Sequence, residues 1–102
     1  MLVFFATASA ECTWVLWSEV DRAAGDVQVT VTTRWTVHAA FKTEEQCRAG
    51  AAKQAAAYAA GNKGTMSEDL RGPTVVVQGT DRMIVATYLC LPDTIDPRGP
   101  KR

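Results

Sequence analysis

The sequence has little of what most catalytic and binding signatures need. The 102-residue chain contains one histidine, and eleven acidic residues balance eleven basic ones, so the formal net charge is zero. A lone histidine leaves no basis for proposing a Ser-His-Asp arrangement. A balanced charge gives no electrostatic reason to expect nucleic acid or an anionic membrane as a partner. No stretch approaches the roughly 20 apolar residues of a transmembrane helix.

Metal-binding and phosphate-binding patterns are also missing. Structural zinc ligands usually come as close pairs such as Cys-x-x-Cys, whereas the three cysteines stand far apart at Cys12, Cys47 and Cys90. Residues 62–65 lack the Gly-Lys-Thr order of a phosphate-binding loop. We therefore expect no cofactor.

The first ten residues look like the end of a secretory signal peptide. An apolar run at residues 2–6 precedes the Ala-Ser-Ala stretch at residues 8–10, which is the small-residue pattern read by signal peptidase. The positive region of a signal peptide is missing, which favours a true start upstream of Met1. We expect the mature protein to begin at Glu11 or Cys12 and to be periplasmic or secreted. The alternatives are an apolar first strand and a lipid-modified Cys12.

The clearest structural signal is a helix over residues 43–61. Thr43 and Gln46 form a capping box at its start, and alanine, the best helix former, fills its interior. Gly61 is expected to adopt the left-handed conformation that ends the helix. One face carries mostly small side chains, so we expect the helix to lie close to a sheet; the stripe comprises Cys47, Ala51, Ala55 and Tyr58.

Strand patterns lie on both sides of this helix. Residues 12–20 and 27–42 predict an antiparallel hairpin, and the second strand alternates with a period of two, which indicates one buried and one wet face. Residues 74–78 and 82–91 predict two more strands, and residues 62–73 are expected to form a loop. The order ββαββ predicts an α+β domain with a mainly antiparallel four-stranded sheet and one helix packed on one face.

The length suffices for one small domain. We assign residues 1–10 to the signal-peptide remnant and residues 11–91 to the domain. Residues 92–102 contain three prolines and are expected to form an extended tail.

Three cysteines in an exported chain allow one disulfide and leave one thiol. Cys12 begins the first strand, Cys47 lies on the helix and Cys90 ends the last strand. A bridge between Cys47 and Cys90 would join the helix to the second hairpin, and we expect this pairing. The alternative is Cys12–Cys47.

A candidate contact surface lies on the first strand. Trp17 and Val15 point to the face opposite Trp14. If the helix covers Trp14, then Trp17 and Val15 are left exposed, and exposed apolar patches often mark interfaces. The alternative is that the tail folds back over Trp17.

Two sequence motifs, one near each end of the chain, are similar to motifs of other proteins. Residues 11–17 read Glu-Cys-Thr-Trp-Val-Leu-Trp, and residues 90–101 read Cys-Leu-Pro-Asp-Thr-Ile-Asp-Pro-Arg-Gly-Pro-Lys. With these ends and a cysteine-bearing helix between them, the chain resembles a group of small, exported, uncharacterised bacterial proteins. The resemblance implies export and a tail that is more than loose coil. It implies no activity and no catalytic residue.

These patterns predict an exported envelope protein that is not an enzyme and that acts by binding a protein, a ligand or a second copy of itself. The alternative is a small enzyme or metal-binding protein that uses Asp93 and Asp96, His38 or a free cysteine. Two carboxylates three residues apart can meet a cation or form an acid–base pair, although such aspartates more often cap a turn and face water.

Overall fold

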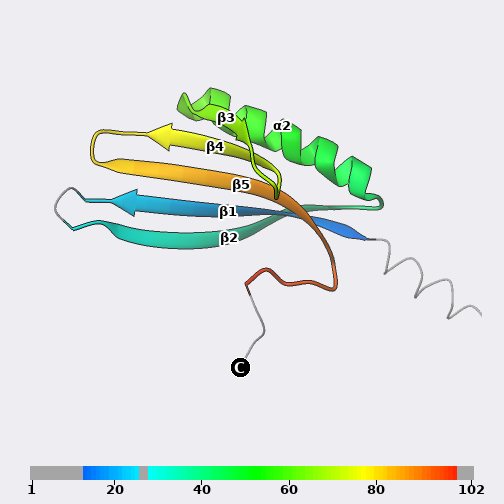
Figure 1. Ribbon diagram of the computed structural model, residues 1–102. Coiled ribbons are helices and arrows are strands. Elements are labelled where there is room, and N and C mark those ends of the chain that lie inside the picture. The colour runs from blue at the N-terminus through cyan, green and yellow to red at the C-terminus, as the bar shows by residue number, and fades with distance from the viewer. Residues whose placement is uncertain (1–12, 26–27, 99–102) are drawn as a thin grey trace, which may run out of the picture.

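The computed structural model describes residues 13–25 and 28–98. Within these residues the chain forms one helix and a five-stranded antiparallel sheet with the strand order β2-β1-β5-β4-β3. The helix covers one face of the sheet, and the segment after β5 turns back below β1 and β2, away from the helix (Figure 1). The predicted α+β class and the covering helix are therefore confirmed. The elements are β1 (Trp14–Ala24), β2 (Thr30–Phe41), α2 (Glu44–Asn62), β3 (Thr65–Glu68), β4 (Pro73–Gln78) and β5 (Arg82–Pro92).

The start of α2 follows the sequence signals. Thr43 is the N-cap, and its hydroxyl accepts a hydrogen bond from the backbone N–H of Gln46 at 3.1 Å. One turn into the helix, the Arg48 guanidinium contacts the Glu44 carboxylate at 2.7 Å. This cap satisfies one of the backbone donors that every helix start leaves unpaired.

The end of α2 differs from the prediction. Gly61 lies inside the helix, and Lys63 takes the left-handed conformation with φ 56°. The reason lies at Gly64, where the chain passes against β4. A Cβ atom at Gly64 would lie 2.7 Å from a methyl carbon of Val75, so the residue without a side chain is used for this close contact rather than for the cap.

The core lies between α2 and one face of the sheet, which we call the helix face. The helix fills it with small side chains at Cys47, Ala51, Ala55 and Ala59, all of them buried, while Tyr58 is partly buried beside them. The predicted stripe of small residues is therefore confirmed. The sheet contributes Leu16, Val75, Ala86 and Tyr88.

The opposite side of the sheet is called the far face. It carries Trp17 and Glu19 of β1 and Leu89 of β5, because neighbouring residues on paired strands point to the same side. In its middle, the Arg71 guanidinium of the β3–β4 loop contacts the Glu19 carboxylate at 2.6 Å. This hydrogen bond and the charge of Glu19 raise the pKa of Arg71. The loop is thereby tied across β5 to β1.

The β1–β2 hairpin is antiparallel as predicted, but β2 contains one extra residue. Leu16 lies opposite Ala39, whereas Trp17 lies opposite Val37, so His38 has no counterpart on β1. This is a β-bulge. Side chains alternate between the two faces of a sheet. One inserted residue therefore places side chains before and after it on opposite faces, although their spacing in the sequence would otherwise put them on the same face.

The bulge decides what β2 buries. Beyond it, Phe41 packs on the helix face. Before it, Val31, Trp35 and Val37 lie on the far face, and Val31 is 61% and Val37 54% exposed. The prediction that β2 has one buried face is therefore wrong, because the unbroken alternation in the sequence runs through a bulge.

The segment predicted as a loop, residues 62–73, contains the fifth strand. β3 pairs antiparallel with β4, and all four of its residues are exposed. A strand that buries no side chain leaves no apolar alternation in the sequence, so its pairing with β4 was missed. The prediction of four strands is wrong for this reason.

Tyr88 yields a pH-dependent prediction. Burial raises its pKa, with a smaller contribution from Tyr58, and its side chain is 4% exposed. The stabilising contribution of the neutral phenol is therefore complete below about pH 10, the ordinary tyrosine pKa, and is lost as pH rises through the raised folded-state pKa. We expect the free energy of unfolding, measured with urea, to fall above about pH 10.

The fall should be shallower in Tyr88→Phe than in wild type. Tyr58→Phe is the comparison: it removes a phenol that is only partly buried and with it the smaller contribution to the raised pKa of Tyr88, so it should change the fall less than Tyr88→Phe. An equally steep fall in wild type and Tyr88→Phe would show that Tyr88 does not govern the alkaline transition.

Candidate functional site

A disulfide joins Cys47 in the first turns of α2 to Cys90 of β5, with 6.0 Å between the two Cα atoms. The expected pairing is confirmed. The alternative partner, Cys12, lies outside the described residues. Cys47 is fully buried, so the bridge passes through the core rather than across the surface.

Removal of the disulfide should lower stability considerably. The bridge closes a loop with a sequence separation of 43, and loop-closure entropy for a loop of this size is worth about 4 kcal/mol. We expect Cys47→Ala/Cys90→Ala, made in a Cys12→Ser background, to lose about 2–4 kcal/mol in urea unfolding. The Cys12→Ser protein with its bridge intact is the control. A loss below about 1 kcal/mol would contradict a stabilising role for the bridge.

Trp17 is not exposed, contrary to the prediction from the sequence. It is 7% exposed, while Val15 is half-buried. The Trp17 ring meets the ring of Trp35 edge-on, with 6.3 Å between centroids, and the Arg98 guanidinium lies 5.3 Å from the Trp17 centroid. The C-terminal segment thus folds back over Trp17, which was the alternative.

Local bonds hold the C-terminal segment in this position. The backbone N–H and the guanidinium of Arg98 both donate to the carboxylate of Asp96, at 2.7–2.9 Å. The backbone N–H of Ile95 donates to the carbonyl of Pro92 at 3.0 Å. These turns present the Arg98 cation to the face of the Trp17 ring, where the ring quadrupole attracts it.

The Trp17 indole N–H is buried and finds no hydrogen-bond partner among residues 13–25 and 28–98. An unsatisfied buried donor costs about 1–3 kcal/mol. The cover over Trp17 is therefore held by the cation and by apolar contact, without help from the indole donor.

Arg98→Ala should loosen this cover. We expect the Trp17 indole proton, followed by NMR, to exchange faster with solvent because the cation–π contact is lost. Arg82→Ala, which removes an exposed arginine from the start of β5, is the matched control. Unchanged exchange in Arg98→Ala would mean that the segment stays in place without Arg98.

The candidate catalytic and metal-binding residues are held in separate contacts. His38 Nε2 lies 2.8 Å from the Ser18 hydroxyl, with the imidazole 5.7 Å from the Tyr88 ring. Asp96 binds Arg98, and Asp93 is exposed. In the described part of the chain, no three His, Cys, Asp or Glu side chains are grouped so as to hold a metal ion. The enzyme or metal-binding alternative stays a prediction.

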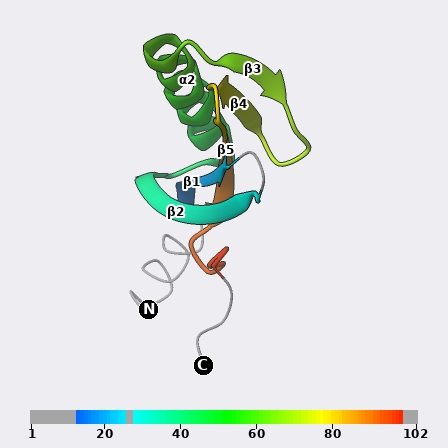
Figure 2. The ribbon, with the colours of Figure 1, turned by 90° about the vertical axis from the view of Figure 1, so that its left-hand side faces the viewer.

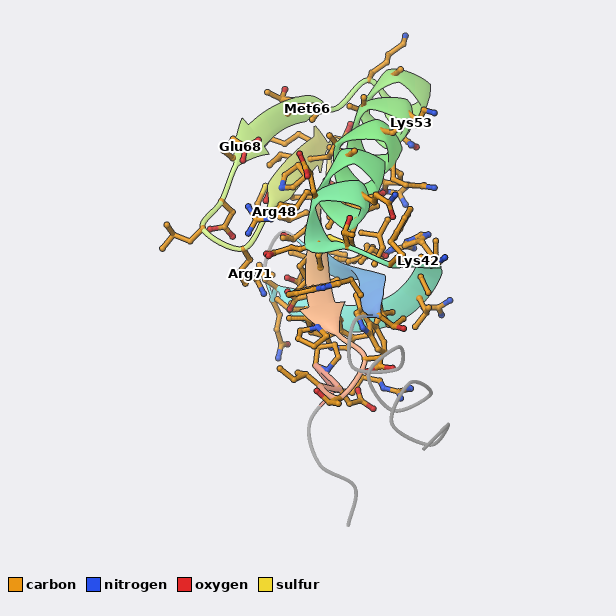
Figure 3. All side chains as sticks on the ribbon, turned by 90° about the vertical axis from the view of Figure 1, so that its right-hand side faces the viewer. Lys42, Arg48, Lys53, Met66, Glu68 and Arg71 are labelled. Atoms are coloured by element: carbon orange, nitrogen blue, oxygen red, sulfur yellow. A yellow bond between two sulfur atoms is a disulfide. The ribbon has the colours of Figure 1, made fainter. Side chains whose placement is uncertain are left out.

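A cavity of about 240 Å³ lies between α2 and the β3–β4 loop. Arg48, Glu68 and Arg71 lie on this side of the helix, whereas Lys42 and Lys53 lie on the other (Figure 3). Acidic and basic side chains both line it, and Arg71 is already bound to a carboxylate. The cavity lining therefore favours neither an anionic nor a cationic ligand.

The outer edge of β2 has no strand paired to it in the described part of the chain. This strand ends the sheet and is twelve residues long, and along it Val31 and Val37 are more than half exposed, as is Val29 just before it. Figure 2 shows β2 as the border of the sheet, with β1 and the helix lying to one side of it. Proteins usually protect such an edge with a short strand, a charged side chain, proline or a bulge. β2 has the charge of Arg34 and the bulge at His38, but it is long and contains no lysine or proline, whereas the opposite edge, β3, has four residues.

No protein-family model, curated protein or solved structure matches the chain. In the described residues, no helix combines the length and the apolar character needed to cross a bilayer. The function is therefore inferred from geometry and from the sequence signals alone.

Proposed function

We propose that this protein is an exported binding domain of the bacterial envelope, that it is not an enzyme, and that its partner adds a β-strand to the outer edge of β2. The observation that carries this proposal is the twelve-residue edge with its exposed valines. Trp17 was the expected contact, but its cover by the C-terminal segment moves the proposed surface to the neighbouring strand.

Three features support export. Disulfides persist in the periplasm and outside the cell, and are rare where glutathione and thioredoxin keep thiols reduced. The Cys47–Cys90 bridge fits such a compartment. The signal-peptidase pattern at residues 8–10 and the resemblance of both chain ends to exported proteins point the same way.

Strand addition sets the chemistry of the partner. Backbone hydrogen bonds supply affinity, and alternating side chains supply specificity. Toward the far face, β2 offers Val31, Trp35 and Val37; toward the other face it offers threonines and Arg34. The partner strand therefore needs apolar residues on one side and, opposite Arg34, no second cation.

Export is tested by intact mass. The gene should be expressed with its native upstream region and the protein recovered from the envelope fraction. We expect a mass that begins at Glu11 or Cys12, with two thiols that react with an alkylating reagent only after reduction. A mass that includes Met1, with all three thiols free, would contradict export.

Use of the β2 edge is tested by photo-crosslinking in cells. A photo-reactive residue placed at Val31 should give a defined adduct, because that side chain lies in the proposed contact. The same residue at Ala56, on the exposed side of α2, is the control and should give none. Absence of an adduct at Val31, or equal adducts at both positions, would contradict the proposal.

A further inference from the structure

We infer that the strand added to β2 is β2 of a second copy of this chain, in an antiparallel register centred on Thr33. The inference rests on the proposed use of the β2 edge and names its occupant. It depends on the length of the regular edge, the order of side chains along it, and the mismatch between the two edges of the sheet.

The regular part of the edge has a defined midpoint. At one end the bulge at His38 interrupts the ladder, and bulges bend a strand and stop regular pairing. At the other end β2 begins at Thr30, with Val29 just before it. Residues 30–37 therefore form the uninterrupted part of β2, and Thr33 and Arg34 are its two central residues.

A two-fold axis at Thr33 places compatible side chains opposite one another. On the far-face side it sets Val29 opposite Val37 of the second copy and Val31 opposite Trp35. On the other side it sets Thr32 opposite Arg34 of the second copy, and no two like charges directly oppose. Cross-strand pairs of aromatic and β-branched residues are among the stabilising ones.

Neighbouring registers are worse. Centring on Arg34 would place the two Arg34 side chains directly opposite each other, and like charges in that position are destabilising. Centring on Trp35 would carry the pairing through the bulge at His38. Centring on Val31 or Thr32 would move Val37 past the end of the regular segment. The edge therefore specifies one register, whereas a flat polar strand would specify none.

The two edges of the sheet do not match each other. β2 is twelve residues long and β3 four, so pairing β2 with β3 of another copy would leave most of β2 uncovered. Such head-to-tail contacts also continue into open chains unless the rotation closes a ring, whereas a two-fold contact closes at two copies. Pairing of β2 with β2 covers the long edge and leaves no new one.

The resulting interface is small. Residues 29–37 amount to well under the roughly 20–30 residues a side of a standard interface. We therefore expect a dissociation constant in the micromolar range rather than an obligate dimer.

The oligomeric state tests the inference. Sedimentation velocity over a concentration series should show a reversible monomer–dimer equilibrium. Val31→Lys/Val37→Lys should weaken it by roughly tenfold or more, because four cross-strand contacts of the dimer change. Leu70→Lys is the control, since it adds a single lysine at a fully exposed residue of the β3–β4 loop, away from β2. Equal weakening by Leu70→Lys would overturn the assignment to β2.

Engineered cysteines test the register, in a Cys12→Ser background. Thr33→Cys should form an intermolecular disulfide, because its two copies lie opposite each other, roughly 5 Å apart at Cβ. Thr36→Cys should not, because its copies lie six residues apart along the strands, about 20 Å. Faster crosslinking of Thr36→Cys than of Thr33→Cys would overturn the register.

The two proposals fail in different ways. If the protein sediments as a monomer at every concentration and Thr33→Cys does not crosslink, the second copy is excluded. In that case, an adduct of a different protein at Val31 would still support use of the β2 edge. Absence of any adduct at Val31 would remove the proposed function itself.

Discussion

The architecture depends on how closely α2 lies on the sheet. The helix meets the strands through alanine and cysteine, and the bridge to Cys90 holds the two Cα atoms 6.0 Å apart. The approach extends to Gly50, where a Cβ atom would come 2.7 Å from the ring of Phe41. Larger side chains along this face would lift the helix and open the core, because interiors are packed to crystal-like density.

Because α2 forms a thin layer, it covers only part of the sheet. Leu16, Val75, Ala86 and Tyr88 come from β1, β4 and β5, and β2 meets this core through Phe41, after the bulge, and through the contact of the His38 ring with Tyr88. The remaining length of β2 extends beyond the helix. The same packing that makes a small chain stable thus leaves its longest edge unpaired among the residues that the structure describes.

Much of the fold follows from local signals. The capping box at Thr43 identified the helix, the alternation identified the hairpin, and the redox setting with the topology favoured Cys47–Cys90. Two features carried no such signal. β3 buries no side chain and depends on the backbone of β4. The bulge at His38 interrupts a pattern that is unbroken in the sequence.

The candidate site was predicted less well, because it depends on contacts between distant parts of the chain. Arg98, near the other end of the chain, lies over Trp17, and Asp96 holds it in this orientation. The sequence left this arrangement as one of two alternatives. The exposure of β2 could not be predicted for the same reason. Apolar alternation shows which side chains share a face but not whether anything covers that face.

The bulge has a consequence for how this chain tolerates change in length. Loss of residue 38 would remove the one residue of β2 that has no partner on β1, so the residues on either side of the gap would keep their present partners in an unbroken ladder. Phe41 would remain on the helix face, and Val31 and Trp35 would remain on the far face. A one-residue deletion at the bulge therefore preserves the arrangement of faces, whereas the same deletion in a strand without a bulge would turn one part of that strand over.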